Sequence, residues 1–288
     1  MGFHSINDGG IDTTKTSGEM ILDYSQYLQD EQHTVVRLGK VQEVPPNQPN
    51  LFFNKGLCPF CNRPAPQVYE TNEESVLFAG SGRGTTQYAW QCDCGWWQIH
   101  THYWDDDTGL AIREKKTRSA ILRRFDITDT TIPIDSLQRE LTNHPQLLYS
   151  LGSRKMEEFV AEVLSDYYDC EVQLVGRSGD GGIDLYLLSG NHVMMVQVKH
   201  RKAKSKRQRV EPVNAIREFL GATLLHKGKE AIFVTTSDRF SPAAQREAQK
   251  AISLNLVNRF ELLDRHDLLK RLNLVQENKS EIWRNHLF

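Results

Sequence analysis

A carboxylate, an amide and an ammonium group lie at the ends of two short apolar stretches, and together they suit phosphodiester hydrolysis. The stretch GDGGIDLYLLSGNHVMMVQVKH contains Asp184, Gln197 and Lys199. Oxygen atoms of Asp184 and Gln197 are ligands for a hard cation such as Mg²⁺, and the Val198 carbonyl offers another. The metal would polarise a phosphate and activate water, while Lys199 would orient that water or neutralise the charge that develops.

A hairpin turn must bring the carboxylate to the amide. If residues 189–192 form the turn, Leu188 faces Val193 in an antiparallel pair, and the same register sets Asp184 opposite Gln197. Directly opposite residues have Cβ atoms about 5 Å apart. A shift of one residue would move the two groups to opposite faces, so the prediction depends on the turn.

Alternation along the second strand determines which other side chains share this patch. The side chains of Gln197 and Lys199 lie on one face, while Val196 and Val198 point into the core. Asp180, in the glycine-rich loop before the first strand, would brace that loop or act as an outer-shell ligand. Taken alone, the loop is as well explained by an ordinary tight turn, and the Gln-x-Lys end by a solvated strand end.

Several ordered motifs together resemble one family. The spacing D-x(12)-Q-x-K resembles the PD-(D/E)xK nuclease superfamily, with Gln in the acidic position. GDGGID and VQVKH, followed by FLGA at 219–222 and FVTTSDRFSPAAQREA at 233–248, are more closely similar to the Mrr-type restriction endonuclease family over roughly residues 153–269. The resemblance implies metal-dependent cleavage of double-stranded DNA, often modified or foreign DNA, and therefore a role in defence.

The resemblance also implies a glutamate on the helix before the first strand. In KMEEFVAEVL, Glu157 best fits the family pattern, and Glu158 is the alternative. Glu157, Asp184 and Gln197 would then hold Mg²⁺ with the Val198 carbonyl, and Lys199 would complete the catalytic set. A solvated helix face is the plain alternative for the glutamate.

Positive charge is concentrated directly after this candidate site. Residues 1–150 contain 13 Lys and Arg against 19 Asp and Glu, whereas residues 151–288 contain 22 against 18. A local basic stretch attracts the phosphate backbone of DNA even when the net charge is −2, although a solvated loop has the same composition. The predicted DNA contacts are Lys199, Arg201, Lys202, Lys204, Lys206, Arg207 and Arg209.

Four of the five cysteines occur in two close pairs. Cys58 and Cys61 form C-x2-C in CPFCNR, which resembles a zinc-ribbon knuckle, and Cys92 and Cys94 form C-x-C. Structural Zn²⁺ takes four such ligands in a tetrahedron, so the spacing favours a zinc site over free buried thiols. The fifth cysteine, Cys170, is most simply a buried small residue.

Aromatic residues and two histidines are dense around the second cysteine pair. His100 and His102 are reserve zinc ligands, although plain strand residues are the simpler interpretation. The aromatic rings either stack on nucleic-acid bases or fill the small core of a ribbon. These residues are Tyr88, Trp90, Trp96, Trp97, Tyr103 and Trp104.

Capping residues mark the helices that surround the candidate site. Asp135 is the expected N-cap of a helix that ends at Leu148, and Ser153 caps a helix with apolar residues every three to four positions. Ser241 is followed by Pro242, which suits the first turn of a further helix. The order of helices and strands after Ser153 predicts an α/β fold.

The predicted fold class is therefore α/β. It comprises a restriction-endonuclease-like mixed sheet flanked by helices, and a smaller N-terminal zinc-ribbon-like β domain. Residues 105–134 fit either a strand or a helix, and VPPNQPN at 44–50 fits a linker. The predicted domains are a polar N-terminal arm at 1–50, a zinc-ribbon-like domain at 51–104, a connector with a helix at 105–150, and an Mrr-like nuclease domain at 151–288.

Composition and function suggest the compartment and the partners. The sequence has no run of about 18 apolar residues and no signal-peptide pattern at its polar N-terminus, so a cytoplasmic location is expected. The expected partners are double-stranded DNA, a second copy of the chain for cutting both strands, and a partner protein of a defence system. Two alternatives stay open: a catalytically inactive nuclease-fold module that binds DNA or recruits a partner, and an RNA-directed nuclease.

Overall fold

The chain folds into two units. The computed structural model describes residues 20–52, 56–78, 81–175, 182–190, 192–202, 209–278 and 282–287. Of these, residues 22–124 and 282–287 form the first unit, and residues 20–21 and 125–278 form the second. Within the described residues, no helix is long and apolar enough to cross a membrane.

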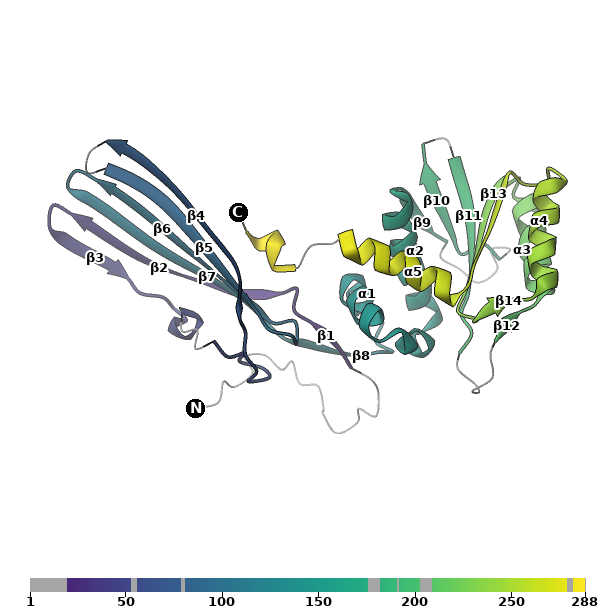
Figure 1. The fold of residues 1–288 in the computed structure, drawn as a ribbon, viewed down its shortest axis with the longest axis horizontal. Coiled ribbons are helices and arrows are strands. Elements are labelled where there is room, and N and C mark those ends of the chain that lie inside the picture. The colour runs from purple at the N-terminus through teal and green to yellow at the C-terminus, as the bar shows by residue number, and fades with distance from the viewer. Residues whose placement is uncertain are drawn as a thin grey trace. The chain divides into compact units, whose positions relative to one another are not determined.

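The first unit is built on a six-stranded antiparallel sheet with the strand order β3-β2-β7-β6-β5-β4 (Figure 1). Its strands are β2 (Tyr27–Arg37), β3 (Lys40–Val44), β4 (Gln67–Phe78), β5 (Ser81–Gln91), β6 (Trp97–Asp107) and β7 (Leu110–Ala120). A 3-10 helix, η1 (Pro49–Phe52), follows β3. A short pair, β1 (Met20–Asp23) with β8 (Arg123–Asp126), lies where the chain passes between the units.

This sheet extends beyond the range 51–104 in which the sequence predicts a β domain. β2 and β3 come from the predicted polar arm, and β7 comes from the stretch that fits either a strand or a helix. Residues of β2 are mostly half-buried instead of alternating between buried and exposed. A strand with two polar faces lacks the apolar alternation that marks a half-buried strand, so its sequence resembles a linker.

An apolar core lies at the end of the sheet that carries the cysteines. It contains the cysteines together with Trp96, Trp97 and Ile99. The C-terminal 3-10 helix, η3 (Ile282–His286), inserts Trp283 into this core, where the side chain is 0% exposed. The Trp283 indole N–H donates to Gln91 Oε1 at 3.0 Å, so the last described segment of the chain is part of the first unit's core.

The second unit is built on a five-stranded mixed sheet with the order β15-β13-β11-β10-β9. Its strands are β9 (Glu171–Leu174), β10 (Leu185–Ser189), β11 (His192–Lys199), β13 (Glu230–Thr235) and β15 (Arg259–Leu263). The central strand β11 pairs antiparallel with β10 and parallel with β13. A short parallel pair, β12 (Val210–Glu211) with β14 (Arg239–Phe240), stands beside this sheet.

Helices cover both faces of the mixed sheet (Figure 1). The helices α1 (Ile134–Asn143), α2 (Ser153–Tyr168) and α5 (Arg265–Asn278) pack on one face, and α3 (Val213–Leu225) and α4 (Pro242–Ser253) on the other. Alternate strand residues serve the two cores: Val196 belongs to the first core and Met195 to the second. The predicted α/β class with a mixed sheet between helices is confirmed.

The hairpin of β10 and β11 has the predicted register. Leu188 pairs with Val193, and the pairing continues to Leu185 and Val196. Val196 is fully buried and Val198 packs against the same core, as the alternation predicts. The turn assignment on which the site depends is therefore correct.

Two helix starts differ from the predicted caps, and one agrees. Pro133 and Gly152 occupy the N-cap positions of α1 and α2, so Asp135 and Ser153 lie within the first turns. The expected helix to Leu148 is split before Pro145, because proline cannot continue the hydrogen-bond ladder, and a 3-10 helix, η2 (Pro145–Ser150), follows. Ser241 does cap α4, and its Oγ accepts the Ala244 N–H at 3.1 Å.

Candidate active site and four-cysteine cluster

Asp184 lies just before β10 and next to the end of β11. Its backbone N–H donates to the Val196 carbonyl at 2.9 Å, and its Oδ2 accepts the Val198 N–H at 2.6 Å. The regular pairing ends at Leu185, so these two bonds join Asp184 to the residues on either side of Gln197. The carboxylate is therefore held beside Gln197, although the two residues do not form a regular ladder pair.

Gln197 carries a buried polar atom with an unmet requirement. The residue is 5% exposed, and among the described residues its Oε1 has no hydrogen-bond partner. Leaving a buried acceptor unpaired costs about 1–3 kcal/mol, so a bound group that occupies this oxygen is favoured. Gly182 leaves room for the side chain, because a Cβ there would lie 3.0 Å from Gln197 Nε2. Its φ of +87° also lies in the left-handed region that favours glycine.

These donors fit a hard divalent cation. Asp184 offers a carboxylate and Gln197 an amide oxygen, and oxygen is the ligand atom that Mg²⁺ prefers. Val198, whose N–H holds Asp184, also supplies the carbonyl that the sequence singles out. Lys199 follows at the last position of β11, and in the described part of the chain it has no ion-pair partner.

The two candidate glutamates on α2 share Arg154 as a partner, since its guanidinium also lies 3.5 Å from Glu158. Glu158 pairs at 2.7 Å with a buried lysine of the same helix. Glu157 pairs with Arg154 at 3.2 Å, and the same guanidinium donates to the Val175 carbonyl at 3.4 Å. The Val175 N–H in turn donates to the Asp184 carbonyl at 2.8 Å. These contacts connect the start of α2 to the Asp184 backbone through Arg154, which pairs with both glutamates, so the choice of Glu157 over Glu158 stays a prediction from the family resemblance.

The basic stretch after Lys199 is partly engaged within the fold. Arg201 binds the Glu211 carboxylate through Nη2 at 2.5 Å and Nε at 3.1 Å. Arg209 lies over the Tyr149 ring, 4.3 Å from its centroid, and donates to the Arg201 carbonyl at 2.9 Å. Lys202 is exposed. Three predicted DNA contacts and the predicted loop aspartate lie outside the described residues: Lys204, Lys206, Arg207 and Asp180.

Glu211 is a residue that the sequence pattern does not single out. It lies in β12, directly before Pro212, the N-cap of α3, and it is 0% exposed. Burial raises the pKa of Glu211, but hydrogen bonds from Arg201 and from the Thr235 hydroxyl outweigh burial and hold the pKa below its usual range. The available signal was an acidic residue at the end of a basic run.

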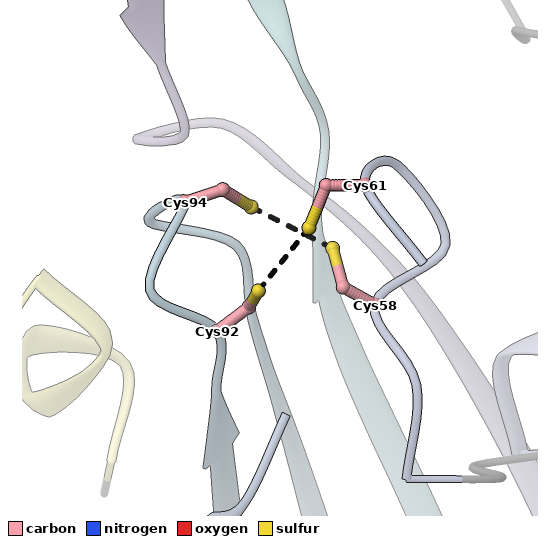
Figure 2. Close-up of side chains that lie close together, drawn as sticks. All are labelled: Cys58, Cys61, Cys92 and Cys94. Atoms are coloured by element: carbon pink, nitrogen blue, oxygen red, sulfur yellow. Dashed lines mark hydrogen bonds between the residues drawn. The ribbon is translucent and has the colours of Figure 1, made fainter. Parts of the chain in front are cut away.

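The four cysteines of the two pairs converge at one point from two loops (Figure 2). Their sulfur atoms all lie within 4.8 Å of one another. Sγ of Cys58 is 3.6 Å from Sγ of Cys94, and Sγ of Cys61 is 3.4 Å from Sγ of Cys92. Four sulfurs around a metal at about 2.3 Å would be separated by similar distances, so the cluster fits a tetrahedral metal site.

The thiols of this cluster differ in acidity. The Arg63 side chain is the main cause of a low pKa at Cys61, about 6. Burial raises the pKa of Cys58 and of Cys92 above the usual range. The cluster therefore holds at least one thiolate near neutral pH, and binding of a metal cation would stabilise the others as thiolates.

The histidines of β6 lie outside this cluster. Among the described residues, the metal-ligand group contains the four cysteines and neither His100 nor His102. His100 packs against Trp90 with ring centroids 4.7 Å apart, and burial is the main cause that lowers its pKa to about 4. His102 contacts Tyr88 at a centroid distance of 5.7 Å. Both histidines are strand residues, as the simpler interpretation states.

Several of the aromatic residues fill the core of the first unit or cover neighbouring backbone. Trp96 and Trp97 are 3% and 1% exposed in the core around the cysteines. Trp104 covers Gly84, where a Cβ would lie 2.6 Å from the indole Nε1. Tyr103 donates its hydroxyl to Asp105 at 2.9 Å. The core interpretation is correct for the two tryptophans beside the cysteines, whereas Cys170 is only partly buried against the core of the second unit.

A mixed sheet between helices, with a carboxylate, an amide and a lysine at the meeting of its antiparallel and parallel parts, defines a nuclease-like α/β domain. The family model Mrr_cat, described as a restriction endonuclease, matches residues 148–269. That part of the chain is a domain of the restriction endonuclease family, as the motifs predict.

Comparisons with whole proteins are less informative. Two solved structures of the restriction endonuclease FokI, one of them bound to DNA, each have 14% sequence identity and a TM-score of 0.35 with this chain. They cover 54% and 55% of this chain, which spans 29% and 33% of theirs. A similarity this weak carries no argument about the fold or the activity. A comparison with curated proteins gives no match.

Proposed function

We propose that the domain at residues 148–269 is a Mg²⁺-dependent endonuclease that hydrolyses phosphodiester bonds in double-stranded DNA. The observation that carries the proposal is the buried Oε1 of Gln197, which has no hydrogen-bond partner among the described residues and lies beside the anchored carboxylate of Asp184. A cation bound there would satisfy the orphaned oxygen and would lie next to Lys199. Membership of the restriction endonuclease family supports the same reaction class.

The residues of the site have two kinds of role in this proposal. Asp184, Gln197, Glu157 and the Val198 carbonyl would hold Mg²⁺, which when bound polarises a phosphate and lowers the pKa of water. Lys199 would orient the attacking water and neutralise negative charge on the phosphate. The Asp184 carboxylate is already oriented by the Val198 N–H, so little reorganisation would be needed on metal binding.

The proposed DNA contacts follow from the positive charge of the stretch that begins at Lys199. The proposed contacts are Lys199, Lys202 and Arg209, with Lys204, Lys206 and Arg207 of the same stretch. Arg201 is left out of these contacts, because the carboxylate of Glu211 already occupies its guanidinium. A second copy of the chain would supply the second cut of a duplex. Defence against foreign or modified DNA in the cytoplasm, with a partner protein of a defence system, completes the proposal.

The amide at position 197 favours a second candidate function. An amide contributes no negative charge to a metal, so a nuclease-fold module without turnover that binds DNA or recruits a partner is the alternative. Cleavage of RNA by the same site is a further version of the main proposal, because RNA has the same kind of phosphodiester linkage for water to attack.

Cleavage of supercoiled plasmid with and without Mg²⁺ tests the proposal. Asp184→Ala and Lys199→Ala should each lower the cleavage rate by about 100-fold, because each removes a group that stabilises the transition state. Lys250→Ala, an exposed lysine on α4, is the matched control and should cleave normally. Glu157→Gln should be impaired and Glu158→Gln should not.

The outcomes separate the candidates. Equal cleavage by the wild-type protein, Asp184→Ala and Lys199→Ala would contradict the assignment of the site. DNA binding without any response to Mg²⁺ or Mn²⁺ would favour the non-catalytic module. Parallel assays on methylated DNA, unmethylated DNA, single-stranded DNA and RNA would define the substrate.

We also propose that the four-cysteine cluster binds one structural Zn²⁺. The convergence of four sulfur atoms in the core of the first unit supports this ion, because Zn²⁺ prefers tetrahedral thiolate ligands. Elemental analysis should find about one zinc ion per chain. A folded preparation without metal would contradict the proposal.

A further inference from the structure

Glu211 carries a fully buried carboxylate that no step of the proposed reaction uses. Its residue is 0% exposed, and burial of a charge is costly unless hydrogen bonds and an opposite charge compensate. It lies in β12, at the end of the basic stretch that begins at Lys199. The free-energy cost of burying this carboxylate next to the candidate site requires an explanation.

Four hydrogen bonds compensate the Glu211 carboxylate. Arg201 donates to both oxygens, at 2.5 and 3.1 Å. The hydroxyl of Thr235 donates to Oε2 at 2.8 Å, and the hydroxyl of Ser237 donates to the same oxygen at 3.1 Å. The acid thus joins the residues that follow β11 to the residues at the end of β13.

The residues at the ends of β11 and β13 also hold the backbone of Lys199 directly. Lys199 pairs with Thr235 at the end of the parallel ladder, so the two side chains lie on one face of the sheet. The Thr236 N–H donates to the Lys199 carbonyl at 3.2 Å, and the Thr236 hydroxyl accepts the Arg201 N–H at 2.7 Å. Arg201 is therefore fixed by its backbone through Thr236 and by its side chain through Glu211.

We propose that Glu211 is a positioning residue for Lys199. By holding Arg201 and Thr235 together, it fixes the chain that follows Lys199 against the end of β13 and so orients the ammonium group toward the candidate site. Arg201 acts in this clamp and not as a phosphate contact, because its charge is neutralised by the carboxylate. The inference rests on the proposed nuclease function, since Lys199 has its role there.

Cleavage kinetics with Mg²⁺ test the clamp. Glu211→Gln keeps the shape of the side chain and removes its charge, and it should lower kcat by at least about tenfold, because small displacements of a catalytic group are costly. KM should stay within about twofold, since no DNA contact is lost. Glu247→Gln is the matched control: it breaks the exposed pair with Arg217, whose atoms lie 3.1 Å apart, and should leave both constants unchanged.

Two further variants test the role of Arg201. Arg201→Met leaves the buried carboxylate without its cation and should be more harmful than Glu211→Gln, whereas the double variant Arg201→Met with Glu211→Gln should recover part of the loss. DNA affinity, measured in an Asp184→Ala background, should not change in these variants. A phosphate contact at Arg201 would instead weaken DNA binding and reduce its salt dependence.

Hydrogen exchange separates failure of the clamp from failure of the nuclease. In the Asp184→Ala background, Glu211→Gln should speed exchange of the Arg201 amide and should leave the amides of β15 unchanged. Unchanged exchange and unchanged kcat in Glu211→Gln would overturn the inference. An effect of this variant on KM alone would also overturn it. A wild-type protein that never cleaves would refute the proposed function, while faster exchange at Arg201 would still support the clamp.

Discussion

The amide of Gln197 determines how much charge the candidate site offers to a cation. Asp184 beside it supplies one carboxylate, and the Gln197 oxygen adds a dipole instead of a second charge. Two neighbouring carboxylates would repel each other unless a cation lay between them. The amide therefore costs the metal-free fold less than a glutamate would, and it binds the cation less strongly.

This comparison predicts the behaviour of Gln197→Glu. Without metal the variant should melt at a lower temperature than the wild type, because a second buried carboxylate is placed beside Asp184. Added Mg²⁺ should raise its melting temperature more than it raises that of the wild type, since the ion binds the folded state more tightly. Gln173→Glu, at an exposed position in β9, is the control. Identical Mg²⁺ responses in all three proteins would contradict a cation site at residue 197.

Gly182 is the second residue on which this geometry depends. Gly182→Ala should destabilise the second unit by about 1–3 kcal/mol, because a Cβ strains a positive φ and also meets the Gln197 amide. Gly190→Ala shares the positive φ, +58°, but has open space around its Cβ. Urea unfolding should therefore show a smaller loss for Gly190→Ala, and only Gly182→Ala should weaken the Mg²⁺ response. Equal losses would remove the contact from the explanation.

The thiol pKa values predict how zinc binding depends on pH. Cys61, with a pKa of about 6, is mostly thiolate at pH 7, whereas Cys58 and Cys92 have raised pKa values and must each lose a proton on binding. Zinc affinity should fall as the pH falls, and more steeply below about pH 6, where Cys61 also becomes protonated. Competition with a chromophoric chelator from pH 5 to 8 measures this.

A variant of Arg63 tests this pH dependence of zinc affinity. Arg63→Gln removes the main cause of the low pKa at Cys61, so the steep part of the profile should move to higher pH. The exposed Arg246→Gln on α4 should leave the profile unchanged. A profile that does not move in Arg63→Gln would show that Cys61 is not the thiol that titrates there.

At the scale of elements, the ends of helices and strands carry separable contributions. Ser241 accepts the Ala244 N–H at the start of α4 and is followed by Pro242. Ser241→Ala should lower the free energy of unfolding of the second unit by about 1 kcal/mol, because it leaves an unpaired donor at the helix start. Ser253→Ala, at the exposed end of the same helix, should cost less in urea unfolding. A larger loss at Ser253 would contradict the cap.

The elements also show which parts of the fold the sequence could predict. The hairpin register followed from apolar alternation and from a short turn, and those are local signals. The bond from Val198 to the Asp184 carboxylate was not predictable, because it replaces a ladder bond where the regular pairing stops. The clamp of Glu211 depends on residues of β13 more than twenty positions away, and no local pattern encodes that contact.

The first unit shows a second limit of sequence patterns. The strands β2 and β7 lie inside its sheet, yet their side chains are polar on both faces and carry no period-two apolar signal. The cysteine spacing, by contrast, was informative, because metal ligation requires particular residue types at particular separations. The cysteine cluster was thus predictable from the sequence, whereas the full extent of the sheet that carries it was not.

At the scale of the whole molecule, the C-terminal segment is a structural part of the first unit. Trp283→Ala should destabilise that unit by about 3–5 kcal/mol, because it removes a fully buried indole from a core that also holds the cysteines. Calorimetry should show a lower transition for the first unit and an unchanged one for the second. Asn285→Ala, exposed in the same segment, is the control, and an equal effect of both variants would contradict the anchoring role.

The return of the chain to the first unit has a consequence for how this protein can be divided or recombined. The second unit's main segment, residues 125–278, is preceded and followed in sequence by residues of the first unit. It is thus an internal insertion and not a terminal cassette. A fusion that takes residues 125–288 would carry Trp283 away from its core, and a swap of the nuclease part between proteins needs two junctions, one on each side.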